Sequence, residues 1–220
     1  DAIAAGMKND HLPLCSGGDG AKAYGEALGV YLSFIVDREA NYSSSLNGWS
    51  GDFIIQTFGR QALPMVWDYA ESNPFSNSTG NWSGAINWIV KSLEKFPAAR
   101  KGEAQQFDAQ SDCGFRNIMI STDPPYYDNI GYADLSDYFY IWLRYSIKKI
   151  YPELFSTMLV PKTEELIATP YRHDGNMEKA KCFFEDGMLL ACKQMYQYAK
   201  EDFPVTIYYA YKQSDSDSKG

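Results

Sequence analysis

The spacing of hydrophobic residues predicts a mainly helical first part of the chain. Apolar residues recur three or four positions apart at Tyr24, Leu28, Tyr31 and Ile35. This spacing indicates an amphipathic helix over residues 21–42, after a flexible break at residues 16–20 (SGGDG). Similar patterns predict a second helix over about 52–70, interrupted at Pro64, and a third from Trp82 to about Phe96.

The second part of the chain alternates between strand-like and helical patterns. Residues 117–122 (NIMIST) form a short apolar run typical of a buried strand. Helical spacing follows over 135–150 and again over 180–198, and residues 205–211 (VTIYYAY) have the β-branched and aromatic composition of a strand. Strand, helix, helix, strand is the order of a crossover between parallel strands. We therefore predict an α/β fold for residues 111–220, preceded by a mainly helical segment at 1–110.

Composition narrows the functional classes. The chain has 220 residues, of which 45% are hydrophobic, enough to bury one substantial core. Its formal net charge of -8 gives no general attraction for polyanions, so contacts with nucleic acid would need a few locally placed cations or another part of the protein. The four cysteines include no C-x-x-C pair and neither histidine stands at ligand spacing from them, so we expect no metal site. Lacking a long apolar run or a signal peptide, the sequence predicts a cytoplasmic protein with no membrane partner.

One motif carries the candidate chemistry: Asp123, Pro124, Pro125 and Tyr126 directly follow the strand predicted at 117–122. In open parallel sheets, ligands bind beyond the carboxyl ends of the strands. Two consecutive prolines stiffen the turn and remove two backbone donors, which leaves the Asp123 carboxylate and the Pro124 carbonyl as acceptors. With the ring of Tyr126 beside them, they would form a planar slot suited to an extruded base whose exocyclic amine donates hydrogen bonds.

The motif resembles the Asp/Asn-Pro-Pro-Tyr/Phe tetrapeptide of the S-adenosylmethionine-dependent amino-methyltransferases. The resemblance implies that Asp123 and Pro124 hold the target amine, that Pro125 shapes the turn and that Tyr126 stacks on the flipped base. It also implies a Rossmann-like methyltransferase sheet, of which this chain would carry a part. The expected cofactor is S-adenosylmethionine.

A wider resemblance extends over four stretches of the chain: residues 58–71, 73–82, 121–147 and 206–213. They are similar to a large bacterial and archaeal family described as adenine-specific DNA methylases, long proteins with an uncharacterised N-terminal domain. The resemblance implies transfer of a methyl group to the exocyclic amine of adenine, with DNA as the partner. Related tetrapeptides occur in RNA methylases and protein glutamine methylases, so these substrates stay open, as does a binding module without catalysis.

Further residues near the motif are candidates for substrate contact. Tyr127, Asp128 and Asn129 either line the target pocket or cap the next segment. Lys212 follows the last predicted strand and so stands on the ligand side of the sheet. The tyrosines of that strand are expected to pack in the sheet. Asp134 and Asp137, near a helix start, favour a capping role over substrate contact.

The glycine-rich turn with which these enzymes bind their cofactor has no counterpart here. The glycines at 17–20 follow no predicted strand, and residues 73–81 (NPFSNSTGN) have the Asn-Pro-Phe opening without paired glycines. We expect the cofactor turn to lie upstream of Asp1, which would make this chain a fragment that depends on an upstream part of the same polypeptide. The cofactor-binding residues are therefore unknown.

Overall fold

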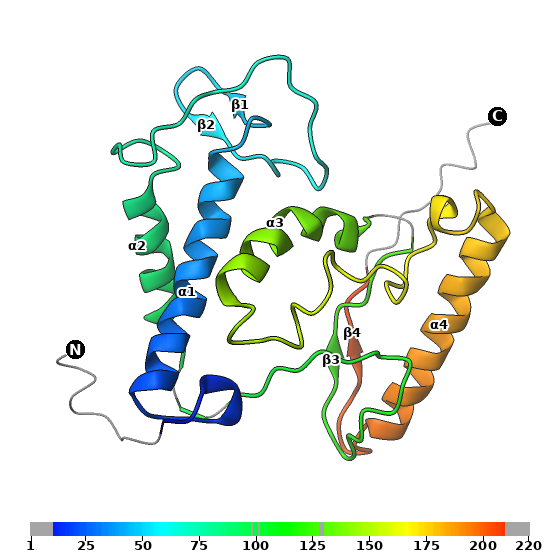
Figure 1. Ribbon diagram of the computed structural model, residues 1–220. Coiled ribbons are helices and arrows are strands. Elements are labelled where there is room, and N and C mark those ends of the chain that lie inside the picture. The colour runs from blue at the N-terminus through cyan, green and yellow to red at the C-terminus, as the bar shows by residue number, and fades with distance from the viewer. Residues whose placement is uncertain (1–10, 98, 101, 128–129, 210–220) are drawn as a thin grey trace, which may run out of the picture. The chain divides into compact units, whose positions relative to one another are not determined.

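The computed structural model describes residues 11–97, 99–100, 102–127 and 130–209, which fall into two compact units (Figure 1). The first unit takes its residues from 1–101 and 133–161, and the second from 102–132 and 162–220. The sequence division into 1–110 and 111–220 stays a prediction. No helix in the described ranges is both long enough and apolar enough to cross a membrane.

Three helices build most of the first unit. They are α1 (Ala21–Tyr42), α2 (Trp82–Leu93) and α3 (Tyr132–Ile147). All residues of α3 after Tyr132 belong to this unit. Figure 1 shows α1 and α2 side by side. The Oδ1 atom of Asn81 caps α2 by accepting a hydrogen bond from the Gly84 amide at 2.7 Å. The helices predicted at 21–42 and from Trp82 are confirmed.

The core of the first unit forms around α3. Tyr140, Ile147 and Phe155 are buried against one another, with Val30 of α1 and Leu143 packed on them. Burying such side chains contributes about 1.5–3 kcal/mol each. A polar contact also ties α3 to α1, because the hydroxyl of Tyr138 donates to the Ala40 carbonyl at 2.7 Å. The periodic residues of α3 therefore serve packing, as their spacing predicted.

The prediction of a helix over residues 52–70 is wrong. This region holds a short antiparallel hairpin of β1 (Gly48–Trp49) and β2 (Ile54–Ile55), and residues 56–81 contain no helix. Two apolar residues of the pattern, Met65 and Trp67, are 79% and 94% exposed. A helix there would have no buried face to stabilise it, and Pro64 would interrupt its hydrogen bonds.

A buried polar side chain holds the hairpin to the end of α1. Asn47 is fully buried, and its amide nitrogen donates to the carbonyls of Asn41 at 3.1 Å and Ile55 at 2.8 Å. Its Oδ1 atom accepts the Ser44 amide at 2.8 Å and lies 3.3 Å from the Thr57 hydroxyl. Asn47 thus replaces backbone partners that a longer strand or helix would supply.

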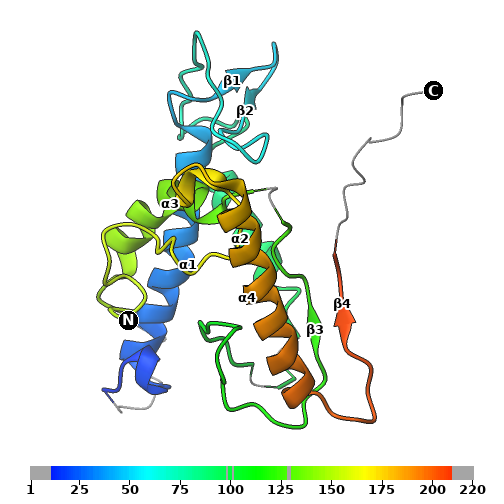
Figure 2. The same cartoon turned by 90° about the vertical axis from the view of Figure 1, so that its right-hand side faces the viewer.

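The second unit contains a parallel strand pair, so the predicted mixed α/β class is confirmed. β3 (Ser121–Thr122) pairs with β4 (Thr206–Ile207), with Ser121 opposite Thr206, and Figure 2 shows both strands pointing the same way. Helix α4 (Met177–Tyr198) precedes β4 in the chain. The two strands are shorter than predicted: Ile118 makes only an isolated bridge to Ala199, and residues 210–211 lie outside the described ranges.

Asp37 of α1 gives the first unit a pH dependence. Its Oδ1 atom is buried and accepts no hydrogen bond from a described residue, and burial raises the pKa of its carboxyl from 3.8 to about 7. The folded state therefore holds this proton more tightly than the unfolded chain does. The contribution of this proton to the free energy of unfolding is therefore complete at pH values below the unfolded pKa. It is lost as the pH rises through the folded pKa.

We expect Asp37→Asn to raise the urea midpoint of unfolding at about pH 8, where the wild type buries a charge, and to change it little at about pH 3. Asp52→Asn is the matched control, because Asp52 is exposed and should leave the midpoint unchanged at both pH values. An equal effect of Asp37→Asn at both pH values would contradict the assignment.

Candidate functional site

The motif Asp123-Pro-Pro-Tyr126, the proline corner, follows directly on β3 at the carboxyl end of the parallel strand pair. The Thr122 carbonyl accepts a hydrogen bond from the Tyr208 amide at 2.8 Å, so the ladder continues to the residue before Asp123. Asp123 is exposed, whereas Pro124 and Tyr126 are partly buried. The corner therefore lies where ligands bind in parallel sheets, with its carboxylate accessible to solvent.

The side chains of Asp123 and Tyr126 are joined across the corner. The Tyr126 hydroxyl donates to Oδ1 of Asp123 at 3.0 Å, and this hydrogen bond is the main cause that raises the pKa of Tyr126. A carboxylate has about four acceptor positions. The bond to Tyr126 uses one of them, which leaves Oδ2 of Asp123 to accept from a ligand.

Tyr209 forms the other side of the site. Its ring meets the ring of Tyr126 edge to face, with centroids 5.5 Å apart and an interplanar angle of 83°. Tyr126 is only partly buried, so part of its side chain stays accessible to a ligand. Sequence reasoning assigned Tyr209 to sheet packing. The signal that could have found it is the parallel register: Thr122 lies opposite Ile207, so the residues after both strands meet at one edge.

Of the four candidate substrate-binding residues, Tyr127 lies in the described part of the chain. Its ring packs against Phe184 of α4 at a centroid distance of 5.2 Å, and its carbonyl accepts a hydrogen bond from the Ala168 amide at 2.8 Å. Its contact with substrate stays a prediction. Asp128, Asn129 and Lys212 lie outside the described residues.

The acidic residues after the motif have structural partners. Asp134 lies in the first turn of α3, where a negative charge favours the helix dipole. Oδ1 of Asp137 accepts the Val160 amide at 2.8 Å, which fastens the loop after α3 to the helix. The position of Asp134 agrees with the capping role that the sequence favoured, whereas Asp137 lies further into α3 and holds the loop that follows the helix.

Among the described residues, no glycine-rich turn follows β3 or β4. Pro124 and Pro125 follow β3 closely, and the described residues after β4 are Tyr208 and Tyr209. Neither strand is thus followed by glycines that would let a backbone approach a nucleotide. Gly17 and Gly18, in turn, belong to the 3-10 turn before α1. The cofactor-binding residues therefore stay unassigned.

Comparisons with other proteins do not identify the chain. No family model, curated protein or solved structure matches it. A function for this protein must therefore be argued from the geometry of the corner itself.

Proposed function

We propose that this chain supplies the amine-binding half of a methyltransferase site, and that the complete protein transfers a methyl group from S-adenosylmethionine to the exocyclic amine of adenine in DNA. The observation that supports the proposal is the placement of Asp123-Pro-Pro-Tyr126 immediately after a parallel strand, with the carboxylate exposed. Packing of Asp123 and Tyr126 into a hydrophobic interior would have argued against it.

The chemistry asked of these residues is to hold an amine and stabilise charge. Oδ2 of Asp123 and the Pro124 carbonyl would accept the two N–H groups of the amine. Nitrogen gains positive charge as it is alkylated, and acceptors already in place stabilise that charge without reorganisation. The ring of Tyr126 would stack on the base and fix its plane. The methyl donor supplies the electrophilic carbon.

The proposal includes a finer fold, a Rossmann-like methyltransferase sheet to which β3 and β4 would contribute neighbouring strands. Their parallel pairing and the helices between them in the chain support this arrangement. Strands beyond these two, and the residues that bind the cofactor, would then come from elsewhere in the polypeptide.

The test is an assay of methyl transfer by the protein expressed from its complete gene. S-adenosylmethionine with a labelled methyl group is offered together with adenine-containing duplex DNA, RNA of the same sequence, or a glutamine-containing peptide. We expect the label in DNA, recovered as N6-methyladenine by mass spectrometry after hydrolysis. Sequencing that detects modified bases, in cells with and without the gene, checks the same result in vivo.

The other substrates give distinct outcomes. Label in RNA alone or in the peptide alone would keep the role of the corner and overturn the choice of DNA. Binding of nucleic acid without transfer to any substrate would favour a non-catalytic module, to which the net charge of -8 gives no general affinity.

A further inference from the structure

Tyr209, which follows β4, contacts two consecutive residues at the end of the proline corner. Its ring meets the ring of Tyr126 edge to face, with centroids 5.5 Å apart, and its hydroxyl accepts a hydrogen bond from the Tyr127 amide at 3.3 Å. All three residues belong to the second unit. Tyr209 is 43% exposed, so it lies at the surface beside the corner and is not part of a buried core.

The parallel pairing of the strands brings Tyr209 to this place. The register sets Thr122 opposite Ile207, and the Tyr208 amide donates to the Thr122 carbonyl at 2.8 Å. Tyr209 follows Ile207 by two residues, as Pro124 follows Thr122. The backbone is thus fastened to β3 at the residue directly before Tyr209. Its side chain can therefore serve as a fixed support for the corner.

The side chain of Tyr126 needs such a support to keep one orientation. The two prolines fix φ only at their own positions, whereas the Tyr126 ring can still turn about two side-chain bonds. Its hydroxyl donates to Oδ1 of Asp123 at 3.0 Å, but Asp123 is exposed, so water competes for both groups. An edge-to-face contact favours one relative orientation of two rings. Tyr209 therefore limits the planes that the Tyr126 ring can adopt.

The backbone after Tyr126 is held by the hydroxyl of the same tyrosine. The amide that donates to Tyr209 belongs to the peptide group between Tyr126 and Tyr127, so this hydrogen bond restrains that peptide. On its other side, the Tyr127 carbonyl accepts a hydrogen bond from the amide of Ala168, which is fully buried. Tyr209 thus restrains both the ring of Tyr126 and the backbone that carries it.

We propose that Tyr209 is a positioning residue of the amine site, which sets the plane of Tyr126 and keeps the Tyr126 hydroxyl on Asp123. Its effect on methyl transfer rests on the proposed function, because it acts through the ring that would stack on the base. Its effect on the hydrogen bond between Tyr126 and Asp123 does not depend on that function. Two measurements, one for each effect, therefore test the assignment.

The first measurement is kcat/KM for methyl transfer to duplex DNA by the protein expressed from its complete gene. Tyr209→Leu removes the ring and should lower kcat/KM by about tenfold. Tyr209→Phe keeps the ring and loses only the hydroxyl, so its kcat/KM should stay within about threefold of the wild type. In Tyr126→Leu, which lacks the ring that Tyr209 orients, adding Tyr209→Leu should cost about twofold or less. Losses that multiply in the double variant would overturn the proposal.

The second measurement needs no methyl transfer. The hydrogen bond to Asp123 is the main cause that raises the pKa of Tyr126, so Asp123→Ala should lower this pKa, as followed by NMR with ring-labelled tyrosine. In Tyr209→Leu, where the hydroxyl is no longer kept on Asp123, the same substitution should lower the pKa by about half as much or less. Tyr132 also raises the pKa of Tyr126, and its contribution cancels in this comparison. An equal fall with and without Tyr209 would overturn the proposal, even in a protein that transfers no methyl group.

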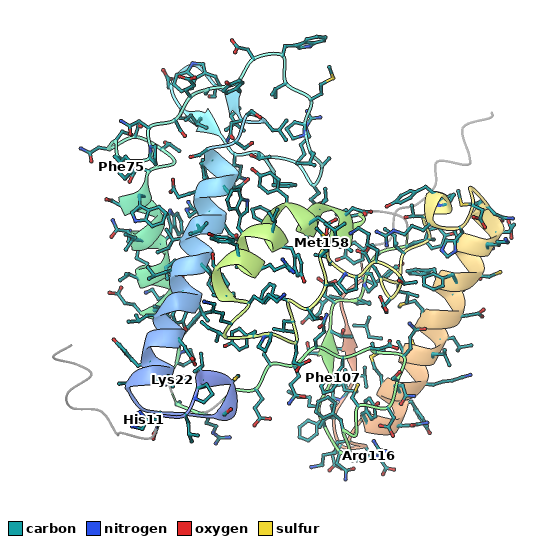
Figure 3. All side chains as sticks on the ribbon, in the orientation of Figure 1. His11, Lys22, Phe75, Phe107, Arg116 and Met158 are labelled. Atoms are coloured by element: carbon teal, nitrogen blue, oxygen red, sulfur yellow. The ribbon has the colours of Figure 1, made fainter. Side chains whose placement is uncertain are left out.

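A second edge-to-face pair in the same unit provides a matched control. The rings of Phe107 and Phe115 lie 5.6 Å apart at 85°, and Phe115 also contacts the last residue of α4. This pair precedes β3 in the chain, whereas the corner follows it; Figure 3 labels Phe107 and also Arg116, the residue after Phe115. Phe107→Leu should leave kcat/KM and the pKa of Tyr126 unchanged. A loss of kcat/KM as large as that in Tyr209→Leu would show a general effect of lost ring contacts and would overturn the proposal.

Discussion

Asp123→Ala should lower the rate of methyl transfer by about a hundredfold or more in the protein expressed from its complete gene. The substitution removes the charged acceptor that would hold the amine and stabilise its developing charge. Stability should be unaffected, because Asp123 is exposed and contributes no apolar contact to a core. The measurement is the initial rate of label transfer to duplex DNA, together with a urea unfolding curve.

Two controls separate this role from general damage. Asp186→Ala removes an exposed carboxylate from α4 and should leave the rate unchanged. The pKa of Tyr126, followed by NMR with ring-labelled tyrosine, should fall in Asp123→Ala, since the acceptor of its hydroxyl is gone. A normal rate in Asp123→Ala, combined with that fall in the pKa of Tyr126, would confirm the geometry and reject the catalytic role.

The largest loss of stability is expected from Asn47→Ala, at about 2–4 kcal/mol. The Ser44 amide and the Ile55 carbonyl would lose the partner that Asn47 provides, in a place that water does not reach. Each such group costs about 1–3 kcal/mol when left buried and unpaired. The free energy of unfolding, from denaturation in urea, measures the effect.

Two further variants test whether the lost stability comes from the buried hydrogen bonds of Asn47 and Thr57. Thr57→Val keeps the shape of a fully buried side chain and removes its hydroxyl, so about 1 kcal/mol should be lost. Asn87→Ala changes the same residue type at an exposed position of α2 and should cost nothing, since alanine is the better helix former. Equal effects of Asn47→Ala and Asn87→Ala would show that the network contributes little.

The elements that could be predicted from the sequence are those whose apolar spacing and whose ends are both determined by residues close together in the chain. The helix at 21–42 has an apolar stripe and a glycine-containing break before it, and α1 has these bounds. The helix at 52–70 failed because a pattern does not reveal whether its apolar residues find a partner. Trp67 contributes to that pattern and is almost wholly exposed.

The candidate site could be predicted from the sequence only in part. The position of Asp123 after a strand follows from the order of residues, so the corner was predicted. The place of Tyr209 depends on the register between strands more than eighty positions apart in sequence, which the pattern of residues does not show.

The order of the segments along the chain determines how the two units could be produced separately. Residues 133–161 belong to the first unit, although residues 102–132 and 162–209 on both sides belong to the second. A single cut can therefore never release either unit whole. A piece ending near residue 101 would lack Tyr140, Ile147 and Phe155, and with them the buried cluster against which α1 packs. Stable halves would have to be made by splicing segments or by circular permutation.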